Sequence, residues 1–355
     1  MRELKIATIG AWGHLGRVLG ELDATPLRVS AMCAAATGED PRTYQQRHRC
    51  AAGAKLYDDH VPLLDEVRPD VVVISTRLDR ITPIAIEAAR RGCHLICEKP
   101  LAIEHASLRE LWDACRGSGV QCLAILDNRV QPAVAAARLA VEQGLLGTVA
   151  LVNARKSYKW GDRPEWFGRR SEYGGTIPWV GIHALDYIHT VTGQSFTSVA
   201  AMHSNVSHPE RPECEDNCAL AVRLSGGGHA TASLDLLRPG AADTHGDDWL
   251  RVVGSHGVLE AEITRNRCTL ITRDKPAHDL PLPPREPYFV PLLESIRSGS
   301  APATPAEEML KAFMLTHVSL CARDAADRGT VINISSEFAQ VGDLSQPQMN
   351  TDEHG

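Results

Sequence analysis

The sequence predicts an α/β protein in which a doubly wound parallel sheet is followed by a second α/β domain with a large, open and mainly antiparallel sheet. Up to residue 126, short apolar runs alternate with helical patterns, which is typical of a parallel sheet. From Thr148 onward, longer segments alternate apolar and polar residues, which is typical of antiparallel strands with one exposed face. At ~150 residues per domain, 355 residues correspond to two domains. We expect the first at 1–126, the second at 127–335 and a polar tail at 336–355.

Composition and charge exclude several classes of protein. A net charge of −7 and a pI near 6.1 argue against binding to nucleic acid or to an anionic membrane. No apolar run approaches the ~20 residues of a membrane-spanning helix. The charged start MRELKIATIG leads into a strand and does not resemble a signal peptide. We therefore predict a cytoplasmic protein.

The ten cysteines are too dilute for a disulfide scaffold, and several lie within apolar segments. They are typical of buried free thiols in a cytosolic protein. Two pairs have a spacing that could suit a metal, Cys93 with Cys97 and Cys214 with Cys218. Because neither is followed by a second pair at zinc spacing, we predict no metal site.

A glycine-rich turn follows the first predicted strand. Leu4–Ile9 is a compact apolar run, and Arg17–Leu22 has a helical pattern. Between them lies Gly10-Ala-Trp12-Gly13-His14-Leu15-Gly16. A strand, a glycine turn and a helix in this order can hold a dinucleotide, because the backbone approaches the pyrophosphate closely and the helix N-terminus attracts it. The spacing is GxxGxxG and not GxGxxG, and the alternative is an ordinary strand-to-helix turn.

The end of the second predicted strand, Leu27–Ala35, bears on the choice between NAD and NADP. An NAD site usually has an acidic residue here that binds the ribose hydroxyls. This chain has three alanines at 34–36, followed by Thr37, Glu39 and Arg42. Glu39 could reach the ribose, whereas Thr37 or Arg42 could hold a 2′-phosphate. The sequence does not decide between the two cofactors.

Lys99 stands at the end of another buried strand. Asp70–Thr76 and His94–Cys97 are apolar runs typical of central parallel strands, and a helix at Ile84–Arg91, closed by Gly92, separates them. The second run leads directly into Glu98-Lys99-Pro100. Ligands of parallel sheets bind beyond the carboxyl ends of the strands, where a buried lysine can act as acid, base or anchor. The alternative is a solvated lysine that begins the next helix.

The remaining elements are predicted from periodicity. Val120–Leu126 is the last strand of the first sheet, and Val130–Gln143 is an Ala-rich helix. The strands of the second sheet are expected at 149–156, 198–203, 219–225, 229–237, 250–253, 258–264 and 268–272. Thr304 and Pro305 have the pattern of a helix start, and we expect that helix to run to about Asp327.

A second group of polar residues lies in the C-terminal half. His183 and Asp186 are three residues apart at a helix start and therefore project to the same side. Polar and aromatic residues suited to a hydroxyl-rich ligand lie nearby, among them Lys156, Tyr158 and Trp160. Such a histidine can be catalytic, but it can also be structural.

These motifs together resemble the glucose–fructose oxidoreductase/inositol dehydrogenase/MocA (Gfo/Idh/MocA) family of NAD(P)-dependent oxidoreductases. The resemblance covers nearly the whole chain. It rests on the glycine turn, on Asp70–Thr76, on Glu98-Lys99-Pro100 and on Gly174-Gly175 followed by His183-x-x-Asp186. It implies a Rossmann domain that holds NAD or NADP and an open C-terminal sheet that often packs against a partner subunit, so we expect a homo-oligomer, a dimer or a tetramer.

The resemblance also implies roles for individual residues. Lys99 corresponds to the family lysine beside the reacting hydroxyl, His183 to the histidine of the proton relay, and Asp186 to the structural acid. We expect the cofactor at Gly10, Trp12, Gly13, His14, Leu15, Thr37, Ser75, Thr76, Glu98 and Lys99. We expect the substrate at Lys99, Lys156, Tyr158, Trp160, Trp179, His183 and Asp186.

The chain departs from the family pattern at several positions. Trp179 replaces the aspartate that commonly completes the relay, and Ala34 replaces the ribose-binding acid. Arg77 and Ile81 stand where many relatives have Pro and His. Without an acid at 179, more of the proton transfer would fall to Lys99, and Trp179 could stack on an apolar sugar face.

The leading hypothesis is an NAD(P)-dependent enzyme that interconverts a secondary alcohol and a ketone on a sugar, cyclitol or related polyol. Hydride transfer belongs to the nicotinamide, while His183 would act as base and Lys99 would stabilise the developing alkoxide. One alternative is a relative that retains its nucleotide and uses transient oxidation for glycoside cleavage or epimerisation. Another is a non-catalytic nucleotide-binding regulator.

Overall fold

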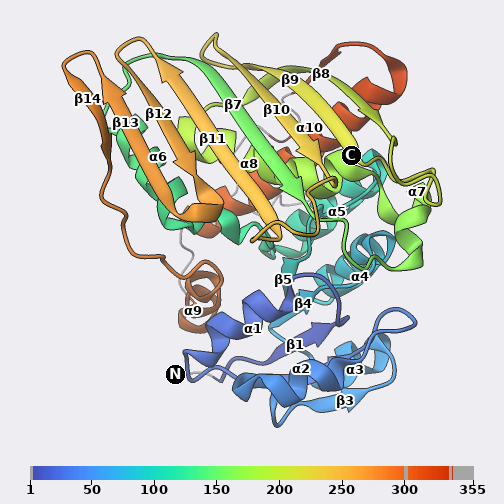
Figure 1. The fold of residues 1–355 in the computed structure, drawn as a ribbon. Helices are drawn as coiled ribbons and strands as arrows, with labels where there is room; N and C mark the ends of the chain where they lie inside the picture. Colours follow the sequence, from blue (N-terminus) through green and yellow to red (C-terminus); the bar gives the residue numbers. More distant parts are fainter. Residues whose placement is uncertain (1–2, 300–302, 336–337, 339–355) are drawn as a thin grey trace, which may run out of the picture.

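The computed structural model describes residues 3–299, 303–335 and 338. Two sheets organise the chain, a parallel one formed by its first third and a larger, mostly antiparallel one formed by the remainder (Figure 1). This confirms the predicted fold class. Apart from Phe338, the predicted tail at 336–355 lies outside the described residues.

The first sheet has six parallel strands in the order β3-β2-β1-β4-β5-β6. The strands are β1 (Ile6–Ile9), β2 (Val29–Cys33), β3 (Lys55–Tyr57), β4 (Val71–Ile74), β5 (His94–Cys97) and β6 (Cys122–Ala124). The strand order reverses between β1 and β4, and in doubly wound sheets this reversal opens the crevice where ligands bind. Strand β3 was not predicted, because its three residues are too few to show a pattern.

Helices connect these strands. They are α1 (Leu15–Asp23), α2 (Pro41–Arg47), α3 (His60–Val67), α4 (Leu78–Arg90) and α5 (His105–Ser118). The prediction of a helix start at Ile84 was wrong, because α4 begins at Leu78 and continues through Pro83. Leu78, Ile81 and Ile84 share one buried face, and this packing outweighs the hydrogen bond that the proline removes.

The second sheet has nine strands in the order β14-β13-β12-β11-β7-β10-β9-β8-β15. They are β7 (Val149–Tyr158), β8 (Phe196–Ser204), β9 (Asn217–Leu224), β10 (His229–Asp235), β11 (Gly246–Gly254), β12 (Gly257–Glu262), β13 (Arg267–Thr272), β14 (Lys275–Asp279) and β15 (Ile332–Asn333). Among the described strands of this sheet, only the β7–β10 pair is parallel. Residues 263–264, predicted as strand, instead begin the 3₁₀ turn η5 (Ile263–Arg265).

In the described part of the chain, most helices of the second half lie on one face of this sheet (Figure 1). They include α6 (Pro132–Glu142), α8 (Ile182–Thr192) and α10 (Ala303–Arg328), which begins one residue before the predicted capping position at Thr304. Within the described ranges, every helix is too short or too polar to cross a membrane. All ten cysteines are buried and free, as predicted.

Helix α9 (Val290–Ser298) returns to the first sheet from late in the chain, beside α1 (Figure 1). Tyr288, Phe289, Leu292 and Leu293 join the apolar cluster that is formed by α1 and by one face of the parallel strands. The Glu21 carboxylate accepts the backbone N–H groups of Tyr288 and Phe289. The core under the first sheet is therefore completed by residues from the second half, and the division at residue 126 stays a prediction.

Candidate active site

The glycine turn after β1 has no room for a side chain at Gly10 or at Gly13. Gly10 and Gly13 have φ angles of +92° and +69°. A Cβ at Gly10 would lie 2.3 Å from the Ser75 carbonyl oxygen, and one at Gly13 would lie 2.3 Å from Glu98 Oε2. Only glycine fits such positions without strain. The turn leads directly into α1, whose first N–H groups have no partner within the helix and can face an anion.

Glu98 joins this turn to the end of β5. Its carboxylate accepts the His14 backbone N–H at 2.7 Å and lies 3.0 Å from His14 Nδ1. The side chain is fully buried. Burial alone would raise its pKa, but His14 and the Lys99 charge lower the pKa of Glu98 to about 2. Glu98 is therefore a buried anion that fixes the turn.

Lys99 is the next residue and is also buried, with 2% of its surface exposed. Its Nζ donates to the Trp179 carbonyl oxygen at 2.8 Å and lies 3.2 Å from the centroid of the Trp179 ring. Burial lowers the pKa of Lys99 well below its usual value, and the charges of Lys156 and Arg17 act in the same direction. The peptide bond to Pro100, which the sequence left open, is cis.

His183 lies in the first turn of α8, directly after the π-helical turn η4 (Ile177–Gly181) that carries Trp179. Its Nδ1 is 3.5 Å from Asn128 Nδ2, whereas its Nε2 is buried and has no partner among the described residues. Burial and the nearby Lys99 charge lower the pKa of His183 well below its usual value. A neutral imidazole with an unused nitrogen can bind a ligand hydroxyl.

Asp186 has a different environment, although it lies on the same side of α8. Its Oδ1 is 2.6 Å from Nη2 of the buried Arg129, which also pairs with Glu308 of α10. Burial raises the pKa of Asp186 to about 6, against the opposing charge of Arg129. Asn128 and Arg129, both in the turn η2 (Asp127–Val130), thus contact His183 and Asp186 respectively. Asp186 therefore takes part in a structural ion pair with Arg129.

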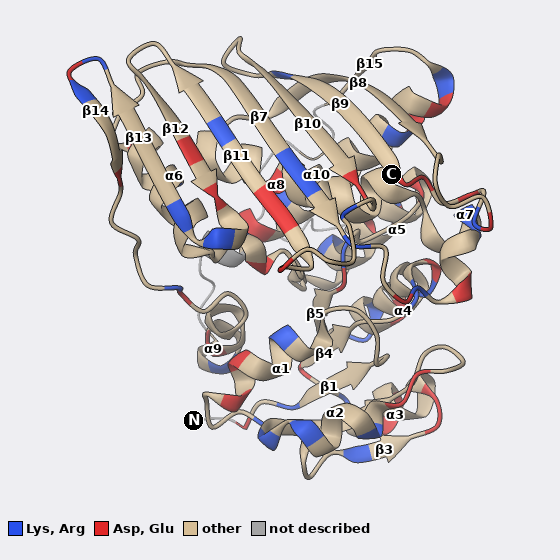
Figure 2. Cartoon of the chain, in the orientation of Figure 1, with Lys and Arg blue, Asp and Glu red and all other residues tan. Residues whose placement is uncertain are grey.

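Lys156 forms a second buried polar cluster. It lies opposite Asp248 in the β7–β11 register, and Figure 2 shows the basic segment of β7 beside the acidic segment of β11. Its Nζ bonds to Asp248 and, at 3.1 Å, to the Tyr187 hydroxyl, and it lies 4.9 Å from the Tyr158 ring centroid. The Asp248 Oδ1 atom is buried and has no partner among the described residues.

Aromatic rings join the glycine turn to the second half of the chain. The Trp12 ring centroid lies 4.7 Å from that of Trp166 and 5.3 Å from that of Trp179. Trp160 lies elsewhere, because its ring stacks on His208 at 3.5 Å. The structure therefore brings Trp12, Trp179 and Lys99 together and places Trp160 against a loop.

A hollow of about 360 Å³ lies just beyond the carboxyl end of β2. Its lining consists of Ala34, Ala35, Ala36, Thr37, Asp58, Asp59, His60, Arg77 and Arg80. Glu39 folds back on this segment and accepts the Ala35 N–H at 2.8 Å and the Thr76 hydroxyl at 2.6 Å. Arg42 is largely exposed and pairs with Asp40. Thr37 therefore lines the hollow, and the hydrogen bonds of Glu39 fix the loop that borders it.

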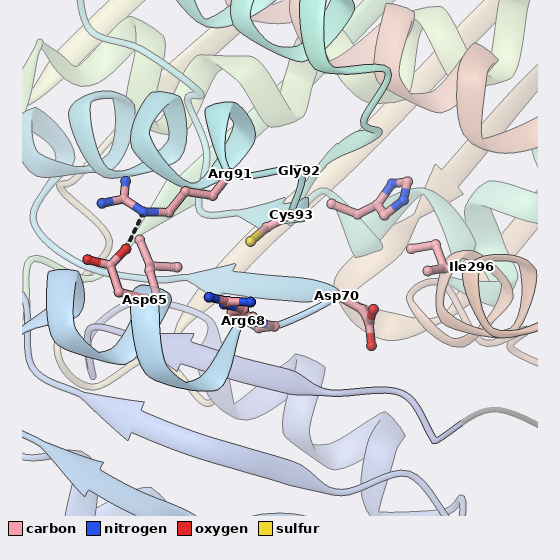
Figure 3. Close-up of a pocket in the computed structure, with 10 residues that line it drawn as sticks. Asp65, Arg68, Asp70, Arg91, Gly92, Cys93 and Ile296 are labelled. Carbon is pink, nitrogen blue, oxygen red and sulfur yellow. Dashed lines mark hydrogen bonds and ion pairs between the residues drawn. The ribbon is translucent and has the colours of Figure 1, made fainter.

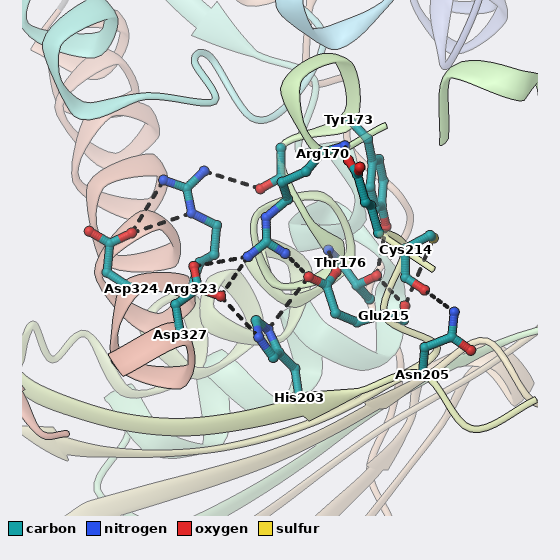
Figure 4. Close-up of polar contacts among 12 residues, drawn as sticks. Arg170, Tyr173, Thr176, His203, Asn205, Cys214, Glu215, Arg323, Asp324 and Asp327 are labelled. Atoms are coloured by element: carbon teal, nitrogen blue, oxygen red, sulfur yellow. Dashed lines mark hydrogen bonds and ion pairs between the residues drawn. The ribbon is translucent and has the colours of Figure 1, made fainter. Parts of the chain in front are cut away.

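A network of charges fixes the segment that precedes η4 (Figure 4). Arg170 pairs with Glu215 and with Asp327 of α10, the latter at 2.7 Å. Glu215 also accepts the Thr176 N–H at 2.9 Å. Gly174 has a φ of +80°, and a Cβ there would lie 2.5 Å from Ile103 Cγ2. These contacts fix the position of the segment that leads to Trp179 and His183.

A hollow of about 670 Å³ lies at the opposite end of the parallel sheet, before the amino ends of β4 and β5 (Figure 3). Arg68, Asp70 and Arg91 are among its lining residues. Arg91 Nε donates to Asp65 at 2.8 Å. Both partners of this pair are substantially exposed.

Comparison with known proteins identifies the family. Residues 4–125 match the model of the oxidoreductase family with an NAD-binding Rossmann fold, and residues 134–260 match the GFO/IDH/MocA C-terminal domain. The chain belongs to the GFO/IDH/MocA family. The resemblance inferred from the sequence is thereby confirmed.

Solved and curated relatives agree with this assignment. The solved structure of a Thermotoga maritima protein classed as an oxidoreductase has a TM-score of 0.85 and 32% identity, covering 93% of this chain and all of that one. The rhizopine catabolism protein MocA of Rhizobium meliloti is 25% identical over 74% of this chain and 79% of its own. Levoglucosan dehydrogenase of Pseudarthrobacter phenanthrenivorans is 30% identical over 42% of this chain and 39% of its own. Some curated relatives are thus matched over less than two thirds of their length.

Several residues of the candidate site were not predicted from the sequence. Asn128, Arg129, Tyr187 and Asp248 contact predicted site residues but lie in no motif. The only signal available was for Asp248, which lies two residues before the predicted strand at 250–253, at the spacing that places it on the same face as Leu250. The others are found only through tertiary contacts.

Proposed function

We propose that this family member is an NAD(P)-dependent dehydrogenase or reductase that interconverts a secondary alcohol and a ketone on a sugar, cyclitol or related polyol. The observation that carries the proposal is that buried Lys99, at the carboxyl end of a nucleotide-binding sheet, lies close enough to buried His183 for its charge to lower the pKa of that imidazole. The names of curated relatives, levoglucosan dehydrogenase and D-glucoside 3-dehydrogenase, support a carbohydrate substrate.

The glycine turn fits a dinucleotide, because Gly10 and Gly13 let the backbone turn tightly against Ser75 and Glu98 directly before α1, whose N-terminus can attract a phosphate. Residues from Gly10 to Leu15 would hold the pyrophosphate, and Thr37 would contact the adenosine end. Ser75, Thr76, Glu98 and Lys99 would border the nicotinamide end. When bound, the nicotinamide supplies or accepts the hydride.

The protein's own residues handle the proton. The lowered pKa of Lys99 makes its amine a competent base for the substrate hydroxyl, and after proton transfer the ammonium is stabilised by the Trp179 carbonyl and ring. His183 presents its unused Nε2 to the same hydroxyl or to its neighbour. This division of work suits a chain in which Trp179 replaces the relay acid.

The Lys156 cluster would recognise the other hydroxyls. Lys156 donates and the free Asp248 Oδ1 accepts, so a polyol could bond to both. Burying a charge pair costs free energy unless further hydrogen bonds complete it, and a substrate hydroxyl would supply one. Tyr158 offers an aromatic face next to Lys156.

A second copy of the chain would cover the outer face of the large sheet. This face bears small side chains such as Ala219 and Ala221, a hollow of about 730 Å³, and Met202 with 73% of its surface exposed. Exposed apolar patches of this kind mark interfaces. We expect a dimer or tetramer by light scattering, and the buried free thiols suit the reducing cytoplasm.

Calorimetric titration with NADH and with NADPH, followed by a polyol panel, tests the function. We expect tight binding of one cofactor and cofactor reduction by at least one polyol. If the folded, nucleotide-free protein binds neither cofactor, the proposal is wrong. Turnover without net cofactor reduction would instead indicate transient oxidation.

A further inference from the structure

Three side chains with metal-binding chemistry converge away from the candidate active site. They are His105 at the start of α5, and His317 and Cys321, which lie one turn apart on α10. One nitrogen or sulfur atom from each lies within 4.8 Å of the others. His317 and Cys321 are 8% and 5% exposed. Within the described ranges, no other group of three or more such residues comes this close.

We propose that His105, His317 and Cys321 bind a zinc ion. Two imidazoles and a thiolate form a donor set that zinc prefers, and ligands four residues apart on a helix point the same way. In a tetrahedral zinc site, a nitrogen and a sulfur ligand are separated by about 3.6 Å, from bond lengths of about 2.1 and 2.3 Å. The Cys321 Sγ and His317 Nε2 atoms are 3.6 Å apart.

The surroundings provide what a bound metal needs. Asp324 Oδ2 lies 3.4 Å from His105 Nε2 and can accept the second N–H of that ring, as carboxylates commonly do beside metal-bound histidines. The Phe338 ring lies 5.5 Å from that of His317 and shields it from water. His105, with its side chain 35% exposed, leaves a path for the ion. Binding would release the thiol proton to solvent, so the affinity should fall as the pH falls.

Such a metal would join the two halves of the molecule. Helix α5 belongs to the first sheet and follows the loop that starts at Lys99, whereas α10 packs under the second sheet. Direct bonds already link the loop to α10, from Arg323 to the Ile103 carbonyl at 2.6 Å and between Thr316 Oγ1 and the Leu101 N–H at 3.3 Å. The zinc would therefore act as a structural clamp behind the Lys99 loop and would take no part in hydride transfer.

Cobalt(II) is a suitable probe, because a Co²⁺–thiolate bond gives a charge-transfer band in the near ultraviolet. The full-length protein is reduced, stripped with a chelator and titrated with CoCl₂. We expect one equivalent to produce the band and ZnCl₂ to displace it, with an upward shift of Tm in zinc. A folded, reduced protein that shows no band would overturn the proposal, because no Co²⁺–thiolate bond would then have formed.

Variants assign the ligands. Cys321→Ser should abolish the band, whereas Cys268→Ser, the same change at a buried cysteine on β13, should leave it intact. His105→Gln, at a half-exposed position, should weaken Co²⁺ affinity at least about tenfold. An undiminished band in folded Cys321→Ser would refute the site. Should that variant not fold, unchanged affinity in His105→Gln would refute it instead.

Discussion

The two ends of the parallel sheet hold their charges in different ways. At the carboxyl end, Glu98 and Lys99 are almost completely buried, and contacts with the glycine turn and with Trp179 fix them. At the amino end, the side chains of Arg91 and Asp65 are 33% and 57% exposed and pair in water. Yet a hollow of about 670 Å³ lies at the amino end.

This comparison shows that the size of a hollow does not locate the chemistry. Exposed ion pairs such as that of Arg91 with Asp65 are screened by solvent and contribute little to stability. Burial is costly for a charge, and only dedicated partners make it tolerable. The shifted pKa values of Lys99 and His183 therefore distinguish the carboxyl end as the candidate active site.

The largest expected effect comes from Lys99→Met, which keeps the length of the side chain and removes its amine. We expect kcat to fall by about 10²–10⁴-fold, because general acid–base catalysis is lost, while cofactor affinity stays within a few-fold. The matched control is Lys55→Met at the amino end of β3, where the lysine is 64% exposed and kcat should not change. A folded Lys99→Met enzyme with near-normal kcat would remove the contrast between the two ends.

Gly13→Ala should come next. The positive φ and the 2.3 Å approach to Glu98 strain any side chain, so we expect a loss of about 1–3 kcal/mol in the free energy of unfolding together with weakened dinucleotide binding. Gly20→Ala on α1, where a Cβ has no atom within 4 Å, should instead gain about 0.5–1 kcal/mol. Urea denaturation and calorimetry measure both, and equal stabilities would contradict the proposed role of the turn.

Glu98 gives the carboxyl end its own acid sensitivity. Its pKa is lowered from 4.5 to about 2 in the folded protein, so its stabilisation is present above pH 4.5 and is lost as the pH falls toward 2. The loss should be roughly 3 kcal/mol in wild type and absent in Glu98→Gln. Denaturation at stepped pH tests this, with exposed Glu110→Gln as the control that should follow wild type. A profile for Glu98→Gln parallel to that of wild type would refute it.

The smallest effect is expected at the amino end. Arg91→Gln breaks the exposed pair with Asp65 and should change the free energy of unfolding by less than about 1 kcal/mol. Steady-state kinetics should show kcat and KM unchanged with any polyol that is turned over. A large change in either would mean that the two ends are coupled.

The elements that could be predicted from the sequence have strong local signals. The runs at Asp70–Thr76 and His94–Cys97 became β4 and β5 because β-branched and apolar residues favour buried parallel strands. The glycine turn was recognisable because only glycine tolerates its geometry. Lys99 could be predicted as a site residue because it lies just after a predicted buried strand.

The features that could not be predicted depend on contacts between distant segments. Asn128 and Arg129 contact His183 and Asp186 only because η2 packs beside α8. His105 comes near α10 only in the folded chain, so spacing in the sequence could not indicate a metal-binding group. Local periodicity in the sequence carries no information about such long-range contacts.

The return of α9 to the first sheet has a consequence for how the chain is made. Ribosomes synthesise a protein starting from its N-terminus, and domains generally fold as they emerge. Here the apolar surface of α1 and the parallel strands stays open until Tyr288–Leu293 have been synthesised. The strands of the nucleotide-binding half are synthesised first, but its apolar core is therefore completed late. Its folding ends together with that of the second half.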